Sequence, residues 1–230
     1  MTFQRYAIYW VPAPDSALAA FARGWFGAEV ETGEPAGPAT DFGLDAALIE
    51  RATASPRRYG MHATIKAPFR LREGASVAGL AEALAAFCAR RRRIRSGPLR
   101  LHRFSRYLAL VLGDERADIG WLADSCVTHF DPFRASLNDG DRARRSGTLP
   151  PAVAELFEQF GYPDIFHRFM FHVTLAGPLD CHELDAVEAA LAPAVAPLLA
   201  APFTVDDLCL CGDPGNGSLF RVLGRFPLLL

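Results

Sequence analysis

The chain has 230 residues, half of them hydrophobic, and a formal net charge of −2. That length and apolar content suffice for one sizeable core, and the small net charge excludes the strong positive field of a general nucleic-acid binder. The apolar runs 78–89 and 184–199 fall short of the roughly 20 residues that a membrane span needs, so we expect no contact with a membrane. Five cysteines and an N-terminus without a basic, apolar leader predict a cytoplasmic protein with reduced thiols.

The first half of the chain is predicted to alternate between strands and helices. An aromatic and β-branched segment at its start ends at Pro12, as a strand entering a turn does, and Ser16 is placed to cap the helix that follows. Leu80, Leu84 and Phe87 recur at helical spacing, which predicts a helix buried on one face. In chain order the expected elements are a strand over 5–11, a helix over 17–26, a loop over 33–42, a short helix over 45–53, a strand over 58–71, a helix over 77–92 and a strand over 99–112.

The second half is predicted to repeat this order after a helical stretch. The arginine-rich segment 131–148 has weak structural signals, and Pro150 and Pro151 are typical of a helix start. A Gly- and Pro-containing loop over 212–217 predicts a hairpin between the last two strands. The expected elements are helices over 118–130 and 150–160, a strand over 168–179, a helix over 182–191, and strands over 203–211 and 218–226. This mixture of strands and helices predicts an α+β fold.

An internal repeat is the strongest signal in the sequence. Segments 62–69 and 172–179 share the pattern His, any, Thr, aliphatic, any, small, Pro, apolar, and each is predicted to lie on a strand that a helix follows. A single His-x-Thr on a strand is more often part of a core than of a site, but two copies in matching contexts favour two structurally equivalent lobes. If a pseudo-twofold axis relates the lobes, both copies face one cavity.

Two such copies suggest chemistry on a phosphate diester. Side chains alternate between the faces of a strand, so His62, Thr64 and Lys66 are expected on one face, and His172 and Thr174 share a face in the second copy. One imidazole can take a proton from the nucleophile while the other protonates the leaving oxygen, which needs no metal ion or other cofactor. The threonine hydroxyls would donate hydrogen bonds to the non-bridging oxygens, and Lys66 would add positive charge unless it reaches solvent instead. Which histidine is the base stays open.

Three further residues are candidate substrate contacts: Tyr6, Arg168 and Arg221. The alternatives are that Tyr6 belongs to the core and that the two arginines are ordinary surface residues. The remaining histidines lack the spacing of a zinc site, and Cys209 and Cys211 are the only close cysteine pair, so buried thiols and no metal site are expected there.

The two motifs, together with segments 6–14, 59–69 and 220–223, resemble the two-histidine (2H) phosphoesterases. The likeness is greatest to the subgroup associated with bacterial phosphonate-utilisation operons, and it spans nearly the whole chain. It implies that His62, Thr64, His172 and Thr174 all take part in phosphoester chemistry.

The same resemblance implies a fold and a substrate. The fold would be one bilobal α+β domain over 1–230, with two lobes of antiparallel sheet and helices over about 1–115 and 162–230, and a helical insertion over about 116–161. The substrate would be a small phosphate ester, the ribose 1,2-cyclic phosphate that a carbon–phosphorus lyase releases. Two alternatives stay open: RNA ends with a 2′,3′-cyclic phosphate, and a non-catalytic module that binds a phosphorylated ligand.

Overall fold

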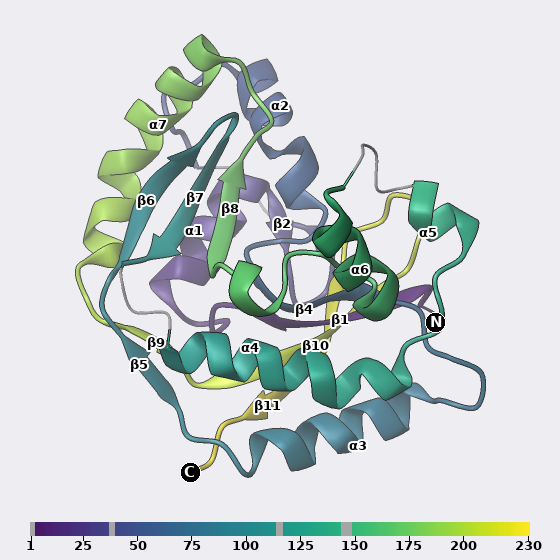
Figure 1. Cartoon of the computed structure of the whole chain (residues 1–230). Coiled ribbons are helices and arrows are strands. Elements are labelled where there is room, and N and C mark those ends of the chain that lie inside the picture. Colours follow the sequence, from purple (N-terminus) through teal and green to yellow (C-terminus); the bar gives the residue numbers. More distant parts are fainter. Residues whose placement is uncertain (1–2, 37–39, 114–116, 144–148) are drawn as a thin grey trace.

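The computed structural model describes residues 3–36, 40–113, 117–143 and 149–230, and two antiparallel sheets lie at its centre (Figure 1). The larger sheet has the strand order β11-β10-β1-β4, and the smaller has the order β6-β7-β8. Their strands are β1 (Arg5–Trp10), β4 (Ala63–Phe69), β6 (Leu99–Phe104), β7 (Tyr107–Leu112), β8 (His172–Ala176), β10 (Asp207–Asp213) and β11 (Arg221–Pro227). Two short pairs complete the strands: β2 (Ala28–Glu29) with β3 (Glu34–Pro35), and β5 (Ile94–Ser96) with β9 (Phe203–Val205). The α+β class predicted from the sequence is confirmed.

Helices cover both sheets: α3 and α4 pack on strands of the larger sheet, and α2 and α7 pack on strands of the smaller. The α-helices are α1 (Ala17–Phe26), α2 (Ala46–Arg57), α3 (Val77–Cys88), α4 (Ala117–Phe130), α5 (Asp139–Ala143), α6 (Pro151–Phe160) and α7 (Cys181–Val195). Short 3-10 turns are η1 (Asp131–Phe133), η2 (Phe166–Arg168) and η3 (Ala196–Leu199). No helix among these described residues is both long and apolar enough to cross a membrane.

Local sequence explains where the helices begin. The hydroxyl of Ser16 accepts a hydrogen bond from the backbone of α1, and the Ser76 hydroxyl does the same for α3, as their sequence positions predicted. Asp180 and Glu183 form a reciprocal capping box at the start of α7. Both motif strands are thus followed by a helix with a side-chain cap, α3 after β4 and α7 after β8.

The larger sheet is apolar on both faces. Tyr6, Ile8 and Trp10 of β1 point into the main core, which also contains the buried face of α3. Tyr9, with Ala7 and Val11, points to a smaller cluster on the opposite face, which is completed by residues of β10 and by Phe220. The strict alternation along β1 therefore decides which of its aromatic residues belong to the core and which face the second cluster.

The sheets do not follow the lobe boundaries expected from the sequence. Strands β10 and β11, from the last part of the chain, share a sheet with β1 and β4, while β6 and β7, from the first half, share a sheet with β8. Part of the segment 116–161, which was expected as an insertion, belongs to the core. Cys126 and Phe130 of α4 in this segment are fully buried. Residues 116 and 144–148 of this segment lie outside the described residues. Strand pairing between distant segments cannot be predicted from chain order alone.

Two single strands of the prediction are each divided in the structure. The strand predicted over 99–112 is the hairpin β6–β7, which turns at Ser105 with a positive φ of 44°. The strand predicted over 203–211 breaks at Asp206, and its two parts, β9 and β10, pair with different partners. The breaks fall at Ser105 and Asp206, which are common turn residues, but neither contains the glycine, proline or asparagine that would mark a turn more strongly.

Candidate active site

The two His-x-Thr copies lie on facing edge strands. β4 is the last strand of the larger sheet, β8 is the last strand of the smaller one, and residues of the two strands are in contact. His172 is the first residue of β8, and His62 immediately precedes the first residue of β4. The fold therefore brings the two motif strands together at the junction of the two sheets.

The two imidazoles are held in the same way. Nδ1 of His62 lies 2.9 Å from the carbonyl oxygen of Gly60, and Nδ1 of His172 lies 2.9 Å from the carbonyl oxygen of Met170. A carbonyl can only accept, so Nδ1 is the protonated nitrogen in each ring, and Nε2 is the atom that can take up or release a proton. Each histidine thus uses the backbone two residues earlier to set its tautomer.

The predicted alternation holds for the first residues of each copy. His62, Thr64, His172 and Thr174 are all partly exposed, whereas Ala63, Ile65, Val173 and Leu175 are buried. The motif positions therefore face a solvent-accessible space, and the residues between them anchor the strands in the core.

A cavity of about 360 Å³ is lined by two of these four residues, Thr64 and His172, whereas His62 and Thr174 are not part of its lining. Thr64 of β4 and His172 of β8 line it from the two sheets, and Arg168 from η2 lines it as well. The guanidinium of Arg168 pairs with Asp164, also of the lining, at 2.9 Å. Of the three predicted substrate contacts and Lys66, the structure places only Arg168 in this cavity.

Lys66 faces a different direction from the one predicted. On β4, Lys66 pairs with Ile8 and Thr64 pairs with Tyr9, so the single residue Ile65 is inserted as a β-bulge between them. A bulge interrupts the alternation of side chains, and Lys66 falls on the face of the main core instead of the face of Thr64. Its ammonium is buried, donates to the carbonyl of Val127 at 3.1 Å, and lies 3.6 Å from Asp131.

Tyr6 and Arg221 are not brought to the cavity either. Tyr6 is 8% exposed in the main core, where its ring contacts Phe3. Arg221 begins β11, at the opposite edge of the larger sheet from β4, and its side chain lies against Gly33. The aromatic residue of β1 that does reach the motif is Tyr9, whose ring lies against His62. Because side chains alternate along β1, either Tyr6 or Tyr9 could face the motif, and the sequence did not indicate which of the two does.

The surroundings of His62 control its charge. Burial among protein atoms is the main cause that lowers the pKa of His62, from 6.5 to about 4; the hydrogen bond to Gly60 opposes this change, and the charge of His172 adds to it. The two imidazoles are therefore close enough to interact electrostatically. His62 is a neutral base with an available Nε2 lone pair at neutral pH.

Sequence reasoning missed several residues of the cavity wall, notably Tyr162, Asp164 and Met170. They lie in the irregular segment between α6 and β8, where no periodic pattern indicates which side chains point inward. The spacing of Asp164 and Arg168, four residues apart with opposite charge, was the one available signal.

No cluster of three or more His, Cys, Asp or Glu residues in the described parts of the chain is arranged to hold a metal ion. Cys209 and Cys211 are buried free thiols, and burial raises the pKa of both. Their interpretation as buried strand thiols is confirmed.

Comparison with known proteins supplies the family. A family model described as "Protein of unknown function (DUF1045)" matches residues 64–221. The chain belongs to the DUF1045 family. The match begins at Thr64 and includes the whole of the second motif.

Two curated relatives of this DUF1045 chain have the same name, "Ribose 1,5-bisphosphate phosphokinase PhnN". The protein from Janthinobacterium sp. (strain Marseille) is 34% identical over 228 residues, which cover 97% of this chain and 50% of the relative. The protein from Laribacter hongkongensis (strain HLHK9) is 33% identical over 231 residues, which cover 98% of this chain and 52% of the relative. The chain thus spans about half the length of the curated relatives it matches.

Two solved structures are similar at low identity. E. coli LigT complexed with 3′-AMP superposes with a TM-score of 0.48 and 14% identity, and the match covers 100% of both chains. TT0787 of Thermus thermophilus superposes with a TM-score of 0.44 and 14% identity, and the match covers 98% of both chains.

Proposed function

We propose that this protein is a metal-independent two-histidine phosphoesterase that hydrolyses a small sugar cyclic phosphate of the ribose 1,2-cyclic phosphate type. The observation that carries the proposal is the matched pair of imidazoles. His172 begins the edge strand β8 and His62 immediately precedes the edge strand β4, each has Nδ1 bonded to the carbonyl two residues earlier, and the two interact electrostatically. Such a pair can remove one proton and supply another across a single phosphorus atom.

His62 is assigned as the general base. Its lowered pKa keeps the ring neutral, and the Gly60 carbonyl keeps the proton on Nδ1, so Nε2 offers a lone pair to the attacking water. His172 lines the cavity and is assigned as the general acid. In its protonated form it has an N–H at Nε2 that can be given to the leaving oxygen.

The proposed reaction is a single displacement. The water oxygen bonds to phosphorus while Nε2 of His62 accepts a water proton, and the bond from phosphorus to the sugar O2 breaks as His172 protonates that oxygen. Thr64 and Thr174 are assigned hydrogen bonds to the non-bridging oxygens, and Arg168 a charged contact to the same phosphate. The product is a phosphate monoester, and solvent returns both histidines to their initial states.

The names of the curated relatives support the substrate class. Opening the P–O2 bond of a 5-phosphorylated ribose 1,2-cyclic phosphate yields ribose 1,5-bisphosphate, the compound in the relatives' name. A phosphoesterase that supplies this compound and a kinase that consumes it would act in succession. Lys66 is the only lysine of this chain and follows Ile65, so the sequence contains no Gly-Lys-Ser/Thr of a P-loop. We therefore assign the phosphoesterase step, and not the kinase step, to the matched half.

The test is hydrolysis of 5-phosphorylated ribose 1,2-cyclic phosphate followed by phosphorus NMR in the presence of EDTA. We expect turnover by the unmodified protein, one product isomer with the phosphate on O1, and a loss of about 10²- to 10⁴-fold in kcat for His62→Ala and for His172→Ala. His182→Ala, on the exposed start of α7, is the matched control and should retain full activity. Undiminished turnover in either motif variant contradicts the mechanism. Turnover only of an oligonucleotide with a 2′,3′-cyclic end would move the substrate to RNA.

A further inference from the structure

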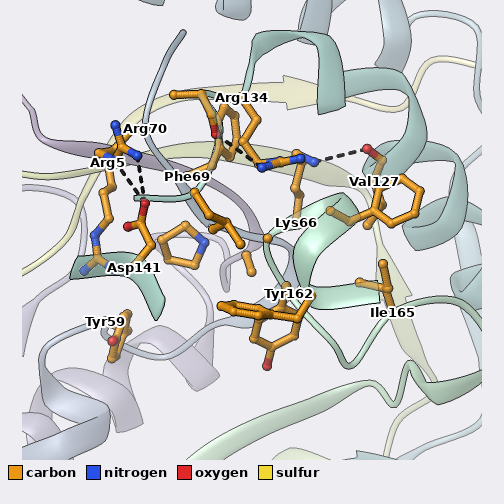
Figure 2. A pocket seen from close by; sticks show the side chains of 17 residues that line it. Arg5, Tyr59, Lys66, Phe69, Arg70, Val127, Arg134, Asp141, Tyr162 and Ile165 are labelled. Atoms are coloured by element: carbon orange, nitrogen blue, oxygen red, sulfur yellow. Dashed lines mark hydrogen bonds and ion pairs between the residues drawn. The ribbon is translucent and has the colours of Figure 1, made fainter. Parts of the chain in front are cut away.

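A second cavity of about 350 Å³ adjoins the proposed active site (Figure 2). Ala67, Tyr162 and Ile165 line both cavities, so these three residues form a common wall between them. Thr64 and Ala67 are three residues apart on β4, which at about 3.3 Å per residue separates them by at most about 10 Å, because the bulge at Ile65 shortens the strand. A pentose with one phosphate at each end can cover such a span.

Four cations line the second cavity: Arg5, Lys66, Arg70 and Arg134. Figure 2 shows Arg5 and Arg70 beside Asp141 at one end, and Lys66, which donates to the carbonyl of Val127, at the other. The rings of Tyr59 and Tyr162 lie across from them. The cavity therefore combines positive charge with an aromatic wall.

The ion pairs around this cavity leave positive charge in excess. Asp131 is shared by Lys66 and Arg134, and it is 3.6 Å from the first and 2.8 Å from the second. Asp213 is likewise shared by Arg5, at 2.6 Å, and by Arg58, at 3.4 Å. The third carboxylate, that of Asp141, pairs with Arg70 at 2.7 Å.

Arg58 does not line the cavity, so in these ion pairs of the described residues the four lining cations share three carboxylates, and the remaining positive charge favours an anion such as a phosphate monoester. Burial lowers the pKa of Lys66 against the opposing effect of Asp131, so a bound anion would also stabilise the charged form of this side chain.

We propose that the second cavity binds a terminal phosphate monoester of the substrate, so that the preferred substrate is a sugar with a cyclic phosphate at one end and a monoester at the other. This inference rests on the proposed function and adds to it the place where the second phosphate of the substrate is bound. It also assigns a role to the segment 116–161, which supplies Arg134, Asp141, Phe157 and Phe160 to the cavity wall. Without that segment the second cavity would lack these four residues of its wall.

The first test compares ribose 1,2-cyclic phosphate with and without a 5-phosphate. We expect the unmodified protein to prefer the 5-phosphorylated compound in kcat/KM by about 10- to 100-fold, the range for a charged hydrogen bond. Arg70→Gln should reduce kcat/KM for that compound at least tenfold more than for the 5-hydroxyl compound, mainly through KM. Arg51→Gln is the matched control, because Arg51 pairs with Glu183 at 2.8 Å outside both cavities and should leave both substrates unaffected. Equal losses for both substrates in Arg70→Gln, or no preference in the unmodified protein, overturn the proposal.

The second test measures binding without turnover. Isothermal titration of ribose 5-phosphate into the His62→Ala variant should show binding that Arg70→Gln weakens about tenfold or more. Inorganic phosphate should bind more weakly than ribose 5-phosphate, and equal affinity would point to a site for free phosphate and would overturn the assignment to a substrate. If no cyclic phosphate is hydrolysed but ribose 5-phosphate binds through Arg70, the proposed function fails while the anion site stands. If a cyclic phosphate is hydrolysed but neither Arg70→Gln nor removal of the 5-phosphate changes the rate, the proposed function stands and the anion site fails.

Discussion

Tyr9 lies against the imidazole of His62, with 4.2 Å between the ring centroids and 39° between the ring planes. Tyr59 contacts the same imidazole at 5.5 Å, and Phe220 lies against both tyrosines. Tyr9 is only 1% exposed, so it excludes water from one side of His62. This aromatic cluster therefore contributes to the burial that lowers the pKa of the proposed base.

Replacing Tyr9 should change the titration of His62. In Tyr9→Leu, water gains access to the imidazole, and we expect the pKa of His62 to rise from about 4 toward 6.5. Tyr9→Phe keeps the ring and should keep the low pKa. The measurement is an NMR titration of the His62 ring protons in the three proteins. An unchanged midpoint in Tyr9→Leu would show that the tyrosine does not control the base.

The low pKa of His62 also predicts how stability depends on pH. The unfolded chain binds a proton on this side chain near pH 6.5 and the folded protein only near pH 4, so the unfolded state holds more protons between these values. The contribution is fully present above pH 6.5 and is lost as the pH falls from 6.5 to 4. Its size is at most about 3 kcal/mol, and the partial exposure of the ring reduces it.

Urea unfolding at pH 7 and pH 5 measures this effect. His62→Gln should lose less free energy of unfolding between the two pH values than the unmodified protein does. Carboxylates titrate in both proteins and cancel in the comparison. Identical losses in the two proteins would mean that the pKa of His62 in the folded state is close to its ordinary value.

Trp25 stabilises the edge of the second motif strand. Its indole N–H donates to the carbonyl of Leu175 in β8 at 2.8 Å, and its side chain is 1% exposed. Trp25→Phe leaves that carbonyl without its donor and removes buried volume, so we expect a loss of about 2 to 4 kcal/mol in the free energy of unfolding. Trp121→Phe is the matched control, because Trp121 is 74% exposed, and it should change stability by no more than about 0.5 kcal/mol. Chemical unfolding monitored by far-UV circular dichroism compares the two.

The five cysteines should differ in reactivity. Cys181 is exposed at the start of α7, while Cys88, Cys126, Cys209 and Cys211 are buried and their thiol pKa values are raised by burial. Because the thiolate is the reactive form, we expect a thiol reagent to modify one cysteine rapidly in the folded protein and all five after unfolding. Cys181→Ser should abolish the rapid reaction. Rapid modification of two or more thiols in the folded protein would contradict the burial of the other four.

The sequence by itself determined the features that depend on neighbouring residues. The repeated His-x-Thr pattern predicted two strands, and Thr64, His172 and Thr174 lie on them while His62 immediately precedes the first. Ser16 and Ser76 marked the starts of two helices. Helix periodicity identified Leu80, Leu84 and Phe87 as a buried face, and all three are buried. Such features follow from the 3.6- and 2-residue periods and from local hydrogen bonds, which act within a few positions of the chain.

Only the tertiary structure decided which residues meet. A single inserted residue, Ile65, turned Lys66 away from Thr64 and into the second cavity. The pairing of β10 with β1 enclosed Tyr9 beside His62 and left Tyr6 in the main core. Bulges and pairings between distant strands arise from contacts that no local pattern encodes, because their stability depends on side chains far apart in the chain. The motif residues were therefore predictable from the sequence, whereas their aromatic and cationic surroundings were decided by long-range packing.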